Sequence, residues 1–246
     1  MTTAQIKFVK SLSQKKFRDQ YGLFVAEGEK LVAEALHSRF KVRDVYRADE
    51  IGEAAMARMT GLSSPSPVLC TVERPDDLQS GELPPKGLFL ALDGIRDPGN
   101  LGTILRIADW FGIDAVYASE DTVDVFNPKV VQATMGAIFR VKFHYTDIPS
   151  LCSRALTAGG AVYGTFLDGE NIYEKSLSNG VERPSVIVIG NEANGISSAT
   201  AACVSHRLYI PPFPADDPGS ESLNAAVATA VTVAEFRRLA LKSFRS

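Results

Sequence analysis

Short apolar runs alternate with longer amphipathic stretches through the second half of the chain. Continuous apolar strands separated by helical stretches are typical of a mostly parallel sheet covered by helices on both faces. We therefore predict an α/β domain over residues 88–246. The runs that predict its strands lie at residues 88–93, 114–119, 140–144, 161–166, 185–190 and 207–210.

The first part of the chain shows a similar alternation of strands and helices over fewer residues. A basic helical pair over about residues 4–20 precedes a strand, a helix over residues 29–38, a second strand and helix, and a last strand. The stretch from Arg74 to Gly87 is rich in Pro, Gly and acidic residues and shows no periodicity, which is typical of a linker. We predict a small α/β domain over residues 1–75, a linker over 76–87 and the larger domain over 88–246.

Composition narrows the class of protein. Of the 246 residues, 45% are hydrophobic and 22% are charged, as in an ordinary soluble globule. The sequence contains neither an apolar run of about 20 residues, as a membrane span requires, nor a signal peptide, so we expect a cytoplasmic protein without membrane contact. The three widely spaced cysteines suggest neither a disulfide framework nor a zinc site, and we expect no metal.

The net charge of −3 argues against indiscriminate binding to polyanions, yet the charge is unevenly distributed. Two clusters contain basic residues without any acidic one, and such clusters occur both on plain solvated faces and on nucleic-acid footprints. The N-terminal cluster comprises Lys7, Lys10, Lys15, Lys16 and Arg18, and the C-terminal cluster comprises Arg237, Arg238, Lys242 and Arg245.

Candidate chemistry is expected beyond the carboxyl ends of the parallel strands. After the first strand, Gly94, Gly99 and Gly102 do not match the dinucleotide-binding fingerprint. Asn100 stands near the start of the following helix, and Arg106 lies six residues further on. The plain alternative is a helix cap followed by a surface arginine.

Two further polar loops are predicted at the same edge of the sheet. Glu192 follows the fifth strand in a glycine-bounded loop, where it can bind a ligand or complement the next helix. After the sixth strand, a proline-rich segment leads to Ser222, Leu223 and Asn224 at the start of the last helix. Ser222 or Asn224 can cap that helix, but three polar loops at one edge favour a binding site.

These motifs, in this order and strand context, resemble those of the SpoU/TrmH class of RNA 2′-O-ribose methyltransferases. The resemblance implies a SPOUT fold with a C-terminal trefoil knot and an L30e-like RNA-binding domain over residues 1–75. It also implies a homodimer and the cofactor S-adenosyl-L-methionine. The matching catalytic positions are Asn100, Arg106, Glu192, Ser222 and Asn224, and the matching cofactor positions are Thr165, Phe166, Gly190, Ile210 and Leu223.

The sequence departs from the family pattern at two places. Ala193 stands where many members have a second glycine, and the segment over residues 211–221 is long and carries Asp216, Asp217 and Glu221. For the reaction, we expect Arg106 to bind a phosphate and polarise the 2′-oxygen, because arginine stays protonated in proteins. Arg106 as a general base is the alternative.

The expected function is S-adenosyl-L-methionine-dependent methylation of a ribose 2′-hydroxyl in RNA, with rRNA preferred and tRNA as the alternative substrate. A non-catalytic RNA-binding or ribosome-assembly protein on the same fold is a second hypothesis, which the intact motifs disfavour. A nucleotide-dependent oxidoreductase is a third, and the missing glycine fingerprint disfavours it.

Overall fold

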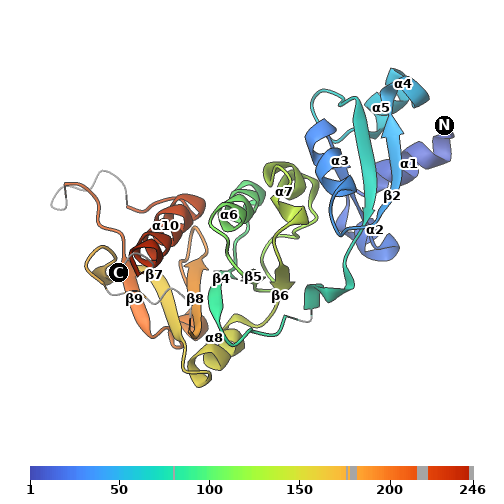
Figure 1. The fold of residues 1–246 in the computed structure, drawn as a ribbon. Helices are drawn as coiled ribbons and strands as arrows, with labels where there is room; N and C mark the ends of the chain where they lie inside the picture. Colours follow the sequence, from blue (N-terminus) through green and yellow to red (C-terminus); the bar gives the residue numbers. More distant parts are fainter. Residues whose placement is uncertain (80, 176, 178–181, 215–220, 244–246) are drawn as a thin grey trace.

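The computed structural model describes residues 1–79, 81–175, 177, 182–214 and 221–243, and these residues form two sheets (Figure 1). The smaller sheet is antiparallel in the order β1-β3-β2, from β1 (Leu23–Glu27), β3 (Val68–Glu73) and β2 (Val42–Arg47). With its helices it is here called the N-terminal unit. These helices are α1 (Thr3–Ser11), α2 (Lys15–Tyr21), α3 (Glu29–Leu36), α4 (Ala48–Ile51) and α5 (Glu53–Met59).

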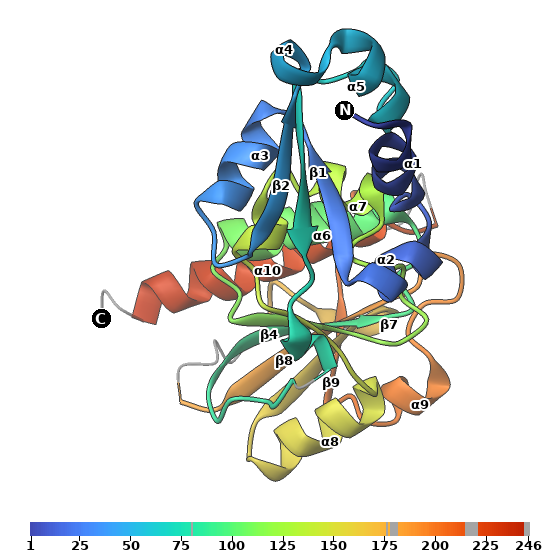
Figure 2. The ribbon, with the colours of Figure 1, turned by 90° about the vertical axis from the view of Figure 1, so that its right-hand side faces the viewer.

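Both faces of the small sheet are covered. Leu31 and Val32 of α3 pack with Phe24 on one face, whereas Ile6 of α1 and Met56 of α5 pack with Leu69 on the other. Figure 2 shows α3 and α1 on opposite sides of the strands. A short helix, η1 (Asp76–Gln79), then leads to the second sheet.

The large sheet has six strands in the order β6-β5-β4-β8-β7-β9, and all its strand pairs are parallel. This confirms the predicted α/β class. The strands are β4 (Gly87–Asp93), β5 (Ala115–Ala118), β6 (Phe143–Tyr145), β7 (Ala161–Asn171), β8 (Pro184–Gly190) and β9 (His206–Tyr209).

Helices lie on both faces of this sheet, as Figure 2 shows, with α6, α7 and α10 on one side and α8 and α9 on the other. Side chains that alternate along β4 therefore enter different cores: Leu88 and Leu90 pack with α6, while Phe89 and Ala91 pack with α8. The helical elements are α6 (Pro98–Trp110), α7 (Pro128–Ala133), η2 (Ala137–Phe139), α8 (Ile148–Thr157), α9 (Ser198–Ala201) and α10 (Ala225–Ser243).

The strand predicted at residues 161–166 is longer than expected. In β7, Thr165 and Glu170 both pair with Leu208 of β9, so the intervening residues bulge out before pairing resumes. A Cβ atom on Gly169 would lie 2.6 Å from the backbone carbon of Leu208, so this close approach needs glycine. Thr165 and Phe166 therefore lie inside a bulged strand and not after its end.

One apolar core joins the N-terminal unit to the large sheet. The Phe24 ring of β1 lies 4.5 Å from that of Phe126 and 6.2 Å from that of Phe139, measured between ring centroids. The ring of Phe40 meets Phe139 edge-on at 5.3 Å. Interfaces between mobile domains are usually more polar than this. The packing indicates that the two sheets are held in one orientation.

An ion pair reinforces this joint. The guanidinium of Arg18 donates to Asp124 at 2.6 and 3.1 Å and to the carbonyl oxygens of Leu12 and Ser13 at 2.9 and 2.8 Å. Only 2% of the Arg18 side chain is exposed. Arg18 therefore does not belong to an RNA-facing cluster with Lys7 to Lys16, because its charge is already neutralised inside the protein.

Within the described residues, no helix is both long and apolar enough to cross a membrane. Cys70, Cys152 and Cys203 are free thiols, the first two buried. Burial raises the pKa of Cys70 and of Cys152 to about 12, so both stay protonated at neutral pH.

Candidate active site

The start of α6 positions Asn100. The helix begins at Pro98, and the carboxylate of Asp97 accepts a hydrogen bond from the backbone nitrogen of Asn100 at 2.8 Å. Asp97 is thus the N-cap, and the alternative that Asn100 caps this helix is wrong. The signal that could have found Asp97 is Asp before Pro, because proline is favoured in the first helical position. The Asn100 side chain is left available for other partners.

The loop after β8 presents Glu192. A Cβ atom on Gly190 would lie 2.3 Å from backbone atoms of Gly195 and Ile196, so only glycine fits there. Asn191 closes the loop: its side-chain oxygen accepts from the backbone nitrogen of Ala193 at 2.9 Å, and its Nδ2 donates to the carbonyl oxygen of Gly94 at 2.6 Å.

Sequence reasoning missed Asn191, although its position directly after Gly190 and its Asx-turn chemistry could have indicated it. Among the described residues, Met135 is the only non-glycine with a positive φ. Ala193 therefore adopts an ordinary backbone conformation, and this loop does not need a second glycine at that position.

The start of α10 positions Asn224. The Oδ1 atom of Asn224 accepts hydrogen bonds from the backbone nitrogens of Ala226 at 2.9 Å and of Val227 at 3.3 Å. Asn224 is thus the N-cap of α10, as one alternative from the sequence proposed. Ser222 and Leu223 precede it and are exposed.

A chain of side-chain hydrogen bonds, here called the amide chain, links these three segments. Nδ2 of Asn224 donates to Oδ1 of Asn100 at 2.8 Å, and Nδ2 of Asn100 donates to Oε1 of Glu192 at 2.7 Å. The members lie 92 and 124 positions apart along the sequence. The fold therefore brings one residue from each predicted motif into direct contact.

The direction of the amide chain follows from its two ends. At one end, the Oδ1 atom of Asn224 is committed to the helix cap, so its Nδ2 must face Asn100. At the other end, the carboxylate of Glu192 only accepts, so the Nδ2 of Asn100 must face Glu192. Neither amide can flip without placing two donors or two acceptors together. The arrangement holds the three side chains in one defined orientation.

Arg106 and Ser222 do not join the amide chain. Arg106 is exposed on α6 and makes no hydrogen bond or ion pair with any described residue. Ser222 is exposed and likewise makes no side-chain hydrogen bond within the described part of the chain. Both side chains are therefore free to contact a ligand. Trp110, one turn beyond Arg106 on α6, is 85% exposed.

Of the expected cofactor positions, Gly190 ends β8 and Ile210 follows β9, whereas Thr165 and Phe166 lie at the bulge of β7. Ile210 follows β9 and is half-buried, and the Leu223 side chain is 48% exposed, which is more than a packed core leucine would be. The Phe166 ring is covered by the guanidinium of Arg207, whose carbon lies 3.5 Å from the ring centroid. Asp216 and Asp217 lie outside the described residues, whereas Glu221 is described and exposed.

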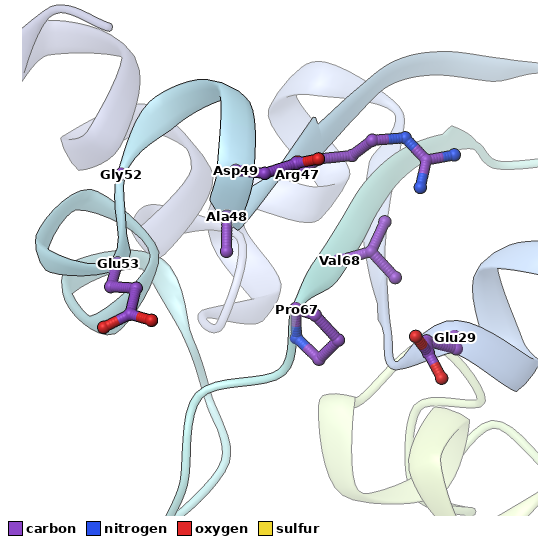
Figure 3. A pocket seen from close by; sticks show the side chains of 8 residues that line it. All are labelled: Glu29, Arg47, Ala48, Asp49, Gly52, Glu53, Pro67 and Val68. Carbon is purple, nitrogen blue, oxygen red and sulfur yellow. The ribbon is translucent and has the colours of Figure 1, made fainter.

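A hollow of about 610 Å³ lies far from the amide chain along the sequence, at one end of the N-terminal sheet. Figure 3 shows the carboxylates of Glu29 and Glu53 on opposite sides of Pro67. With Asp49, three acids face one arginine, Arg47, and this charge is unsuited to RNA. The hollow is therefore not the candidate active site. Among the described residues, no three His, Cys, Asp or Glu side chains are arranged to hold a metal ion.

Comparison with known proteins places this geometry in a family. The model of the SpoU rRNA Methylase family matches residues 87–234, and that of the MRM3-like substrate binding domain matches residues 3–70. The 23S rRNA (guanosine(2553)-2′-O)-methyltransferase RlmP of Bacillus subtilis is 30% identical over 248 residues, covering 95% of this chain and 96% of the relative.

Solved structures match nearly the whole chain. A structure from Porphyromonas gingivalis, assigned to the TrmH family of RNA methyltransferases, is 37% identical with a TM-score of 0.85, covering 97% of this chain and 99% of that one. The AdoMet-bound rRNA methyltransferase from Sinorhizobium meliloti is 30% identical with a TM-score of 0.80, covering 97% and 96%. With the family match over residues 87–234, these likenesses show that the chain belongs to the SpoU family of rRNA methylases.

Proposed function

We propose that this protein transfers a methyl group from S-adenosyl-L-methionine to a ribose 2′-hydroxyl of ribosomal RNA. The amide chain carries the proposal, because it holds one side chain from each of the three motifs in a single, fully directed network. The relative RlmP is by name a 23S rRNA 2′-O-methyltransferase, which supports rRNA over tRNA as the substrate.

The residues at the strand ends fit this cofactor. Leu223, half-exposed directly before Asn224, offers apolar surface next to the amide chain, and half-buried Ile210 offers more beyond β9. We assign cofactor binding to these two residues together with Gly190, Thr165 and Phe166. When bound, S-adenosyl-L-methionine supplies an electrophilic methyl group.

The protein's own contribution is positioning and charge. Asn100 and Glu192 are held by the amide chain and can orient the ribose, which removes much of the entropic barrier to transfer. Ser222, two residues before Asn224, adds an exposed hydroxyl. The guanidinium of Arg106, which has no partner among the described residues, can bind the neighbouring phosphate and donate to the 2′-oxygen. It thereby stabilises the charge that develops there as the hydroxyl releases its proton to solvent.

The test is single-turnover methylation of 23S rRNA by the wild type and by Arg106→Lys and Arg106→Ala. Lysine keeps the charge but loses the planar fork, so we expect both variants to lose a factor of about 10² or more in rate. S-adenosylhomocysteine should bind all three proteins within a few-fold, as measured by calorimetry.

Each outcome is informative. A methylation rate of Arg106→Lys near that of the wild type would rule out the forked contact of the guanidinium. Preferred methylation of tRNA would change the substrate. Cofactor binding without transfer to any RNA would favour a non-catalytic RNA-binding protein.

We further propose the domain division at residues 1–75, 76–87 and 88–246, with an L30e-like fold for the first part, and a trefoil knot in the last. The knot is supported by the path of the chain, because β9 lies at the sheet edge whereas Asn224 returns to Asn100 and Arg237 donates to the carbonyl oxygen of Phe111 at 2.7 Å. We also propose that the protein acts in the cytoplasm, which its similarity to the bacterial relative RlmP supports.

A homodimer is supported by an apolar stripe beside the amide chain. Val227 is 49% exposed, and Val231 and Ala234 follow it at helical spacing on α10, which packs beside α6 (Figure 1). We propose that a second copy covers this stripe. Val227→Lys should shift the sedimentation of the protein toward the monomer, whereas Leu36→Lys, at a 50% exposed position on α3, should not. Equal behaviour of the two variants would refute the stripe.

A further inference from the structure

Three aromatic side chains of α1 and α2 meet at the surface of the N-terminal unit. The ring of Tyr21 lies 5.0 Å from that of Phe8, edge to face, and 6.3 Å from that of Phe17, nearly parallel to it. Tyr21 is 42% exposed, and both phenylalanines are half-buried. The Tyr21 hydroxyl makes no hydrogen bond within the described residues. This cluster is here called the aromatic platform.

Four exposed lysines lie on the same two helices as the aromatic platform. Lys16 places its Nζ atom 4.6 Å from the centroid of the Phe17 ring. Lys7, Lys10 and Lys15 are exposed on the same two helices, and of these four lysines only Lys15 has an ion-pair partner within the described residues, Asp19 at 2.7 Å. Three ammonium groups are thus left without a counterion in the described part of the chain.

Buried and exposed side chains of this helix pair have different roles. Arg18 is buried and committed to Asp124 and the joint between the sheets. Tyr21 of the aromatic platform is partly exposed, and Lys16 lies over the Phe17 ring. Aromatic side chains usually pack in the core, and surface lysines are usually scattered. A partly exposed ring cluster beside lysines that lack a described ion-pair partner therefore favours a ligand with flat faces and negative charge.

We propose that the aromatic platform stacks on unpaired bases of the RNA substrate while the lysines bind the adjoining phosphates. This inference rests on the proposed function. Bases in an A-form helix are stacked on one another and cannot reach a side-chain ring, so the ligand is a single-stranded loop or bulge. Stacking on aromatic side chains tolerates any base, and lysines supply the salt-dependent part of the binding.

The experiment uses the full-length protein and a fluorescein-labelled oligouridylate of about 12 nucleotides, free or annealed to oligoadenylate. Tyr21→Ala and Tyr21→Leu should weaken binding of the single strand about tenfold, whereas Tyr21→Phe should bind as the wild type does. Annealing should remove these differences. Lys16→Ala should lower the slope of log affinity against log salt concentration by about 0.7, the value for one phosphate of a single strand.

Lys30→Ala is the matched control, because Lys30 is exposed on α3, on the opposite face of the small sheet. It should leave the affinity of the single strand and the salt slope near the wild-type values. Thermal melting checks that each variant is folded, and Phe17→Leu serves as a second test of stacking should Tyr21→Ala melt early.

Wild-type affinity of Tyr21→Leu and Phe17→Leu for the single strand would overturn the stacking role of the aromatic platform. Equal losses of RNA affinity in Lys30→Ala and Lys16→Ala would overturn the role of the lysines. Wild-type affinity of all variants for RNA, combined with capture of a ribosomal protein that needs Tyr21, would assign the surface to a protein partner. Methyl transfer to 23S rRNA is measured in parallel. If the wild type transfers methyl groups but the aromatic variants keep wild-type KM, the platform fails while the proposed function stands.

Discussion

The buried guanidinium of Arg18 closes the joint between the two sheets, and its removal should destabilise the protein. The alternative is an RNA contact, because Arg18 belongs to the N-terminal basic cluster. The perturbation is Arg18→Ala. It removes two hydrogen bonds to Asp124 and those to the carbonyl oxygens of Leu12 and Ser13.

The expected cost follows from burial. The side chains of Arg18 and Asp124 are 2% and 11% exposed. Removing the arginine therefore leaves a largely buried carboxylate whose remaining hydrogen bond, within the described residues, comes from the backbone nitrogen of Phe126 at 3.0 Å. Breaking such a pair lowers the free energy of unfolding by about 3–5 kcal/mol. Asp124→Ala should cost a similar amount. The double variant should cost less than the sum of the two, with a coupling energy of about 2 kcal/mol.

The assay is urea unfolding of the four proteins of this cycle. The matched control is Arg39→Ala, because Arg39 also faces an acid across the junction, Asp77, but at 4.0 Å and with 57% of its side chain exposed. Exposed pairs of this kind contribute about 0.5 kcal/mol. A loss below about 1 kcal/mol in Arg18→Ala, together with a reduced salt slope for RNA, would show that Arg18 is an RNA contact and refute the joint.

Three further predictions concern the site and its strands. Asn224→Asp keeps the cap of α10, so the free energy of unfolding should change by less than about 0.5 kcal/mol. It removes the donor to Asn100, so the single-turnover methylation rate should fall by about tenfold to a hundredfold. A wild-type methylation rate in Asn224→Ala, which loses both the cap and the donor, would contradict this. Gly190→Ala forces a Cβ atom to 2.3 Å from backbone atoms and should weaken S-adenosylhomocysteine binding in calorimetry by at least about tenfold, an overpacking cost of about 1–3 kcal/mol, while Gly61→Ala, whose nearest atom is 4.0 Å away, should leave it unchanged. Desolvation, helped by repulsion from Lys175, lowers the pKa of His206 in the folded protein. The unfolded chain, with a pKa of about 6.5, then binds more protons, so the free energy of unfolding should fall as pH drops from about 7 to 5.5, and fall less in His206→Gln; equal pH slopes in urea melts would disprove it.

The class of fold and the segments that carry the candidate site could be predicted from the amino-acid sequence. Apolar runs such as residues 185–190 are long enough and continuous enough to require burial on both faces, and burial of this kind implies a parallel sheet. Polar residues directly after such runs, Glu192 among them, must lie at the carboxyl edge. Both features depend on residues that are close together in the chain, so the spacing of residues in the sequence predicts them.

Contacts between distant residues, and the burial of charged residues inside the protein, could be seen only in the folded chain. Asn100 reaches Glu192 because β4 and β8 are neighbours in the sheet, and strand order leaves no trace in the periodicity of either strand. In the sequence Arg18 is indistinguishable from its neighbouring lysines, because its partner Asp124 lies 106 positions away. The bulge of β7 likewise depends on the backbone of β9 approaching Gly169. Each of these outcomes depends on contacts between distant segments, and such contacts form only when the whole sheet is assembled.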